Sequence, residues 1–407
     1  MKKFSIFLFA AAFLCACSIS EKNAPEDYLE PGVTDDGYWE GGSSGQGEQG
    51  QAGVVTAGEW RDLDNWLFWS NLMTASQSDQ TGTNYAEYSE YWGLYTNNRV
   101  AVRVTDANGV PQRDVPVTLN YHESDIDIAP KPLYQGRTDN KGEVNLWIGL
   151  TQNQEVKDVS NLGLLVNNEP EQAVIITHWG DEVQWNECIT SVTPTTNIDI
   201  AFIVDATGSM SDEISFLKSD LTDIINKVQD RQSSANIRTA ALFYRDEGDE
   251  YVTKTNDFTS HLSQTVDFIK NQYADGGGDY PEAVHTALEM GMQQLSWREE
   301  NSIRLAFMLL DAPPHHQDNV IASLQASIPQ YAKRGIRIIP VAASGVDKPT
   351  EFFLRFTALA TDATYVFLTN HSGVGGDHIE ATIGEYNVEL LNDLIVRLIN
   401  QYLDSEF

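Results

Sequence analysis

Cysteine is scarce in this sequence, because only Cys15, Cys17 and Cys188 occur among its 407 residues. The first two end an N-terminal apolar run, so Cys188 is the one thiol in the remainder of the chain. A single thiol cannot form an intramolecular disulfide, and the fold must therefore be stabilised by its hydrophobic cores even in an oxidising compartment. We expect Cys188 to be a small buried residue, with an intermolecular bridge as the alternative.

Basic residues are also few. The chain has 26 Lys and Arg against 59 Asp and Glu, a formal net charge of −33. Such a surface repels phosphate backbones, so nucleic acid is not an expected partner. It attracts cations and basic patches of other proteins. The simpler interpretation is a solvated acidic surface that keeps the protein soluble.

The apolar run from Phe4 to Cys15 is too short for a membrane-spanning helix, which needs about 20 residues. It follows the basic start Met1-Lys2-Lys3 and is typical of a signal peptide. The run ends Leu14-Cys15-Ala16-Cys17, which resembles the bacterial lipoprotein signal. That resemblance implies cleavage before Cys17, lipidation of this cysteine, and anchoring in the cell envelope, most simply at the outer membrane. An ordinary secreted protein with an incidental cysteine is the alternative.

Composition divides the chain into five parts. Residues 1–16 form the signal peptide, and residues 17–55 contain a Gly/Ser/Gln tract that predicts a flexible tether. Residues 56–94 form an aromatic-rich helical segment, residues 95–195 a β-sandwich, and residues 196–407 an α/β domain.

The aromatic-rich segment predicts one short helix, over Leu63 to Met73, which Asp62 is placed to cap. Trp66, Trp69 and Leu72 fall on one face at helical spacing. We expect this face to pack against the next domain, and sugar binding by exposed aromatic rings is the alternative.

Short strands separated by turns dominate residues 95–195. Arg99 to Val104 alternates apolar and polar residues, and the turns Asp106 to Gly109 and Asp139 to Gly142 each precede a further strand pattern. These stretches resemble bacterial immunoglobulin-like or carboxypeptidase-regulatory-like sandwich modules. The resemblance implies an all-β N-terminal domain that acts as a spacer.

From Asn197 onward, apolar strands alternate with amphipathic helices. Asn197 to Val204 is almost continuously apolar, as expected for a strand buried on both faces, and a helix follows over Ser211 to Val228. The same alternation recurs to the C-terminus. The pattern predicts a doubly wound, mostly parallel sheet of six strands with helices on both faces.

Polar residues follow three of these strands, at the edge where open parallel sheets bind ligands. The first group is Asp205-Ala206-Thr207-Gly208-Ser209, in which Gly208 permits a sharp turn. This loop resembles the D-x-S-x-S motif of von Willebrand factor A domains, with threonine at the middle position. The hydroxyl and carboxylate oxygens are the donors that a hard cation prefers.

The second group is Asp275 to Ala283, a glycine-rich loop in which Asp279 falls where the family places a threonine. Pro281 and Glu282 are predicted to lie in the first turn of the following helix. A glycine-rich turn in which Asp279 caps that helix is the alternative. Asp311 ends a third apolar strand and matches the family's last metal-site aspartate.

The resemblance implies a Rossmann-like domain with a metal-ion-dependent adhesion site for Mg²⁺, or for Mn²⁺ or Ca²⁺. The implied ligands are Asp205, Thr207, Ser209, Asp279 and Asp311, and the implied rim residues are Tyr280, His315 and His316. One coordination position is left for an acidic side chain of a protein partner. The function this predicts is cation-dependent adhesion or assembly by a membrane-anchored lipoprotein.

Two other functions are open at this point. The chain is a structural or chaperone-like component of an envelope complex if the domain has lost its ligand. A metal-dependent hydrolase would use the aspartates and the paired histidines to activate a water molecule. The sequence has neither a nucleophile elbow nor an H-E-x-x-H motif, so we do not expect an enzyme.

Overall fold

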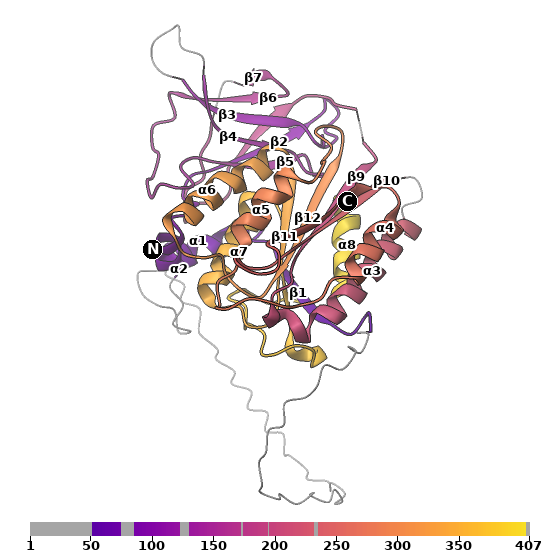
Figure 1. Ribbon diagram of the computed structural model, residues 1–407. Coiled ribbons are helices and arrows are strands. Elements are labelled where there is room, and N and C mark those ends of the chain that lie inside the picture. Colours follow the sequence, from indigo (N-terminus) through magenta and orange to yellow (C-terminus); the bar gives the residue numbers. More distant parts are fainter. Residues whose placement is uncertain are drawn as a thin grey trace, which may run out of the picture. The chain divides into compact units, whose positions relative to one another are not determined.

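The computed structural model describes residues 51–74, 85–122, 130–171, 174–193, 195–231 and 235–403 (Figure 1). The predicted signal peptide, Cys17 and the tether up to residue 50 lie outside these ranges. Within them, no helix is both long enough and apolar enough to cross a membrane.

The centre of the fold is an eight-stranded sheet, and not the six-stranded sheet expected from the sequence. Its five central strands are parallel, while both edges carry antiparallel strands. In spatial order the strands are β11 (Thr253–Thr259), β10 (Asn236–Tyr244), β9 (Asn197–Asp205), β12 (Ile303–Leu310), β13 (Ile336–Ala342), β14 (Tyr365–Leu368), β1 (Thr56–Trp60) and β15 (Glu389–Leu390).

Eight α-helices occur in the described part of the chain, and six of them cover the two faces of the sheet (Figure 1). Contacts between helices separate α3, α4 and α8 on one face from α5, α6 and α7 on the other. The sheet is therefore doubly wound, as the alternating pattern predicts. The helices are α1 (Trp66–Thr74), α2 (Tyr85–Trp92), α3 (Ile214–Arg231), α4 (Leu262–Lys270), α5 (Val284–Gln293), α6 (Asp318–Lys333), α7 (Lys348–Ala360) and α8 (Leu391–Leu403).

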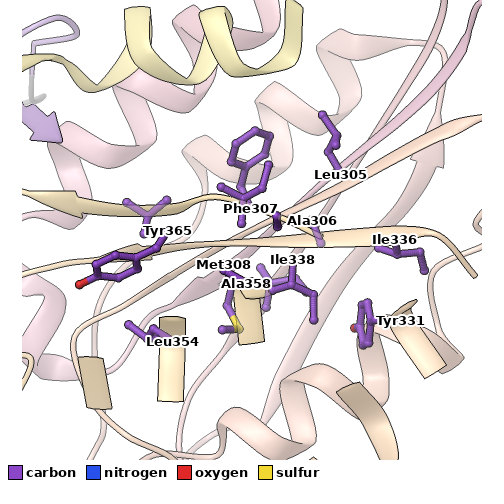
Figure 2. Close-up of a cluster of buried hydrophobic side chains, with 14 of the residues drawn as sticks. Leu305, Ala306, Phe307, Met308, Tyr331, Ile336, Ile338, Leu354, Ala358 and Tyr365 are labelled. Carbon is purple, nitrogen blue, oxygen red and sulfur yellow. The ribbon is translucent and has the colours of Figure 1, made fainter. Parts of the chain in front are cut away.

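Side chains of the central strands alternate between the two helical layers. In β12, Phe307 points to one side of the sheet and stacks on Phe202 of β9. Met308 points to the other side, toward Leu354 of α7 and Tyr331 of α6 (Figure 2). Every residue of β12 and β13 is buried, which is why these strands are uninterrupted apolar runs in the sequence.

The aromatic-rich segment differs from its prediction at its start. Residues 56–60 form the strand β1, which pairs with β14 and extends the central sheet, whereas the sequence predicts only a short helix in this segment, over Leu63 to Met73. Gly58 permits this pairing, because a Cβ there would lie 2.6 Å from the ring of Phe367. The aromatic side chains do pack internally, and Trp69 stacks on Phe352 of α7.

Two small sheets lie in the region predicted as a β-sandwich. One has the order β5 (Glu143–Trp147), β2 (Arg99–Thr105), β8 (Trp185–Ile189), and the other β4 (Lys131–Arg137), β3 (Pro116–Tyr121), β6 (Leu162–Val166), β7 (Glu169–Glu171). Cys188 is buried in β8, as expected. An immunoglobulin-like kinship and a spacer role for these sheets stay predictions.

The small sheets contact the amino ends of the central strands. Asp114 forms an ion pair with Arg304 of β12, and Asp362, just before β14, accepts a hydrogen bond from the backbone N–H of Asn145 at 3.1 Å. Tyr134 donates to the carbonyl of Ala360 at 2.8 Å. The opposite, carboxyl edge of the sheet holds the candidate site.

Candidate cation site at the carboxyl edge of the sheet

The first loop of the site follows β9 and leads into the short 3-10 helix η1 (Gly208–Asp212). Asp205 and Thr207 are fully buried, and the carboxylate oxygen Oδ1 of Asp205 accepts bonds from the backbone N–H and the hydroxyl of Thr207, at 2.9 and 2.7 Å. The hydroxyls of Thr207 and Ser209 lie 3.2 Å apart. The three residues predicted from the motif therefore come together.

The glycine-rich second loop lies directly against the first. The N–H of Gly208 donates to the carbonyl of Gly276 at 3.0 Å. A Cβ at Gly277 would lie 2.9 Å from Oε1 of Glu282 and 3.2 Å from Cβ of Thr207. Gly277 also has a φ of +70°, so both the backbone conformation and the close approach require glycine there.

Glu282 belongs to the site, and its predicted position in the first turn of a helix is wrong. Helix α5 begins only at Val284. The N–H of Glu282 donates instead to the carbonyl of Pro313 at 2.8 Å, and the residue forms a β-bridge with Pro314. This pairing with the third loop holds the segment extended and places the side chain of Glu282 in the buried interior of the site.

Asp311 follows β12 in the third loop and is buried. Its carboxylate faces the hydroxyl of Ser209 and lies close enough to Asp205 for the two negative charges to repel. The structure thus brings four of the five predicted ligands together: Asp205, Thr207, Ser209 and Asp311.

Three buried carboxylate oxygens at this edge have no hydrogen-bond partner. They are Oδ2 of Asp205, Oε2 of Glu282 and Oδ1 of Asp311. Burial, followed by repulsion from neighbouring carboxylates, raises the pKa of Glu282 to about 9. Burial likewise raises the pKa of Asp205 and of Asp311. Buried polar groups are normally paired, so three orphaned oxygens together fit a bound cation.

The site opens into a hollow of about 560 Å³. Asp279, the fifth predicted ligand, lines this hollow but is exposed to solvent. Among the described residues, no three His, Cys, Asp or Glu side chains form a ready-made metal site. The fit to a hard cation therefore depends on the hydroxyls of Thr207 and Ser209 and on water, which such cations accept readily.

The predicted rim residues have different surroundings. Tyr280 lines the hollow, and its hydroxyl donates to the carbonyl of Gly345 at 3.0 Å. The imidazole of His315 lies 2.7 Å from Oδ1 of Asp246. His316 stacks on the ring of Tyr91, with ring centroids 3.7 Å apart, so its side chain contacts helix α2.

Glu213 and His378 form a buried pair beside the site that the sequence did not reveal. The carboxylate of Glu213 accepts a bond from the backbone N–H of Ser344 and lies 2.9 Å from Nε2 of His378. Nδ1 of the same histidine lies 2.8 Å from Oδ1 of Asn370. Glu213 is 131 positions from Ser344 and 165 from His378 in the chain, and no local pattern links it to them.

One region of the chain matches a known protein family. Residues 199–354 match the family model of the von Willebrand factor A domain. The chain is 35% identical over 122 residues to a RING finger protein described as ariadne-like, from Acanthamoeba polyphaga mimivirus. It is 30% identical over 142 residues to an alpha-protein kinase of Dictyostelium discoideum.

These matches cover 30% and 35% of this chain but only 12% and 22% of the relatives' own lengths. Among solved structures, the conserved hypothetical protein BatB from Bacteroides thetaiotaomicron is similar over 50% of this chain and 98% of that chain, with 12% sequence identity and a TM-score of 0.35. The matched region contains all three loops of the candidate site. Residues 199–354 are therefore a von Willebrand factor A domain, a kind of domain that in general mediates protein–protein interaction.

Proposed function

We propose that this chain is a lipoprotein anchored through Cys17, and that its A domain binds a protein partner through a divalent cation. The cation is held by Asp205, Thr207, Ser209 and Asp311, with Glu282 as a further ligand. The presence of the A domain supports an interaction function. The lipoprotein-like signal around Cys17 supports the anchor.

The orphaned oxygens of Asp205, Glu282 and Asp311 carry this proposal. Leaving several carboxylates buried without a partner costs free energy, and a cation among them would remove that cost. When bound, Mg²⁺ would supply a Lewis acid that binds an oxygen atom of the partner. The chain's own residues fix the position of the cation, because the first loop is held by its internal hydrogen bonds.

The exposed residues around the hollow are proposed to meet the partner. Asp279 lies on the glycine-rich loop, where we propose that it contacts the water shell of the cation. Tyr280 presents an aromatic ring that is about two-fifths exposed while its hydroxyl is bound to the neighbouring loop. Aromatic residues of this kind are enriched at protein interfaces. We assign His315 and His316 to the outer rim.

Calorimetric titration of the chelator-treated full chain with MnCl₂ and MgCl₂ tests the cation site. Asp205→Asn and Glu282→Gln should each weaken cation binding at least tenfold, since each removes a charged ligand from a buried site. Asp275→Asn is the matched control, because Asp275 is an exposed carboxylate on the same glycine-rich loop. Equal cation binding by Asp205→Asn and the control would contradict the site.

A second experiment tests the interaction itself. Membranes carrying the tagged full chain are solubilised, and co-purified proteins are compared with and without EDTA, then again with excess Mg²⁺. A partner that leaves with EDTA and returns with Mg²⁺, and that Asp205→Asn fails to capture, is the expected result. A partner retained equally under all three conditions would favour a structural component of an envelope complex that needs no cation.

A further inference from the structure

A second cleft lies at the end of the sheet opposite to the cation site. Its volume is about 510 Å³, within the range of roughly 300–1,000 Å³ that is common for small-molecule sites. Trp60, which lines it, pairs with Tyr365 at the beginning of β14, whereas the cation loops follow the carboxyl ends of the strands. The two sites are therefore separate.

Three parts of the chain that are distant in sequence form this cleft. Residues 59–65, which include the end of β1, provide one wall, the turn at residues 139–141 between β4 and β5 a second, and the end of α8 a third. The walls are fixed to one another, because the side-chain amide of Asn140 donates to the carbonyl of Gln401 at 2.6 Å. Ligand sites often form where separate parts of a fold meet in this way.

The cleft offers mainly hydrogen-bond acceptors. Its partly buried cation, Arg61, is already ion-paired with Asp64 and lies 3.8 Å from Asp139. The lining holds the carboxylates of Glu59, Asp64 and Asp139 and the basic residues Arg61 and Lys141, and Glu59 is itself ion-paired with Arg397 at 2.9 Å. An anionic ligand such as a phosphate would therefore find the guanidinium of Arg61 already paired, in a chain that is strongly acidic overall.

The rest of the lining consists of the aromatic residues Trp60 and Tyr402, of Leu398 and Thr364, and of uncharged amides. The indole of Trp60 is held in place, since its N–H donates to Asp62 at 3.0 Å and its ring meets Phe68 edge to face. The amide side chains of Asn65 and Gln401 also line the cleft, and Gln401 is exposed. A rigid apolar ring beside carboxylate and amide oxygens suits a ligand with one apolar face and many hydroxyl donors.

We propose that this cleft binds a neutral saccharide, with a sugar ring against Trp60 and its hydroxyls bonded to Asp64, Asn65 and Gln401. The proposal is independent of the cation site. A chain that binds a sugar but no cation would support this proposal and contradict the cation site. A chain that binds a cation but no sugar would do the reverse.

Saturation-transfer NMR on the full chain tests the proposal. The probes are cellobiose, maltose and N,N′-diacetylchitobiose, with spermidine and inorganic phosphate as competing chemistries. We expect at least one disaccharide to receive saturation, strongest at its ring C–H protons, and EDTA to leave the signal unchanged. Spermidine and phosphate should neither bind nor displace it.

Variants at exposed positions keep the test independent of folding. Gln401→Ala and Asp64→Asn should each weaken disaccharide binding at least tenfold while the thermal midpoint stays within a few degrees of wild type. Gln152→Ala removes an exposed glutamine elsewhere and should change nothing. The proposal is overturned if no disaccharide binds, if both cleft variants bind like the control, or if spermidine or phosphate is the species bound.

Discussion

Replacing Asp62 by asparagine would remove the negative charge from a buried ion pair that joins the N-terminal segment to α7. Arg355 is fully buried, and its guanidinium contacts the two oxygens of Asp62 at 2.6 and 3.0 Å. The same guanidinium donates to the hydroxyl of Tyr85 at 2.9 Å and to the carbonyl of Thr382 at 2.6 Å. One arginine therefore holds three separate segments of the chain together.

The expected loss of stability in Asp62→Asn follows from the buried charge of Arg355, which loses its partner. Removing one partner of a buried ion pair typically costs 3–5 kcal/mol, roughly, because the remaining charge is desolvated without compensation. Glu351 lies 3.8 Å from Arg355 and offsets part of that loss, and the asparagine amide keeps one acceptor oxygen. We expect Asp62→Asn to lower the free energy of unfolding by about 3 kcal/mol, measured by urea denaturation followed by circular dichroism.

A double-mutant cycle separates the pair from its surroundings. Arg355→Met alone leaves Asp62 buried without its cation, so it should also cost about 3 kcal/mol. The double variant Asp62→Asn/Arg355→Met removes both charges of the pair, and its cost should fall below the sum of the single costs by roughly 1–3 kcal/mol.

The control is Glu155→Gln, which removes an exposed ion pair with Lys157 and should change stability by less than about 0.5 kcal/mol. If Asp62→Asn were as mild as this control, or if the cycle were additive, the N-terminal segment would not be an integral part of the α/β unit.

Three further predictions concern pH, cation binding and the glycine-rich loop. Burial raises the pKa of Asp362 from 3.8 to about 6, so the folded state favours its protonated form. The contribution of Asp362 to the free energy of unfolding is present below about pH 4 and is lost as the pH rises through 6. By pH 7 the loss should reach about 3 kcal/mol. Urea denaturation across pH 4–7 should show this loss in the wild type and not in Asp362→Asn. Cation binding at pH 7 should release protons, because the pKa of Glu282 is raised to about 9. Calorimetric titration in buffers of different ionisation enthalpy would detect these protons. A heat of cation binding that is the same in every buffer would refute this prediction. Gly277→Ala should weaken cation binding and cost about 1–2 kcal/mol of stability, whereas Gly278→Ala, whose Cβ would meet no atom within 4 Å, should leave both unchanged.

Strands buried on both faces could be predicted closely from the sequence. β9 agrees with the expected strand Asn197 to Val204 to within one residue, because burial on both faces demands an uninterrupted apolar run. The convergence of the loops after β9 and β12 follows from the same parallel arrangement, since the carboxyl ends of parallel strands share one edge.

Edge strands and the interior of the site were not predictable in the same way. β11 has the sequence TKTNDFT and no fully buried residue, so it shows no apolar pattern. β1 is short and contains Gly58, and only its pairing with β14 makes it a strand. Glu282 follows a proline, and local sequence rules predict that it lies in a helix. Its pairing with Pro313 and Pro314 in the third loop, which no local pattern reveals, decides its position.

The buried position of Glu282 changes what partner the site can accept. Asp205, Glu282 and Asp311 carry three negative charges when ionised, and a divalent cation leaves one of them uncompensated. A partner carboxylate would then approach a site that keeps one negative charge, because cation binding displaces the proton that the raised pKa of Glu282 otherwise favours. Glu282→Gln should therefore have opposite effects on two affinities that can be measured separately. It should weaken binding of Mn²⁺ and, at saturating Mn²⁺, strengthen binding of an acidic partner at pH 8. If both affinities fell together, Glu282 would act only as a ligand, and the partner would not bind through a carboxylate that competes with its charge.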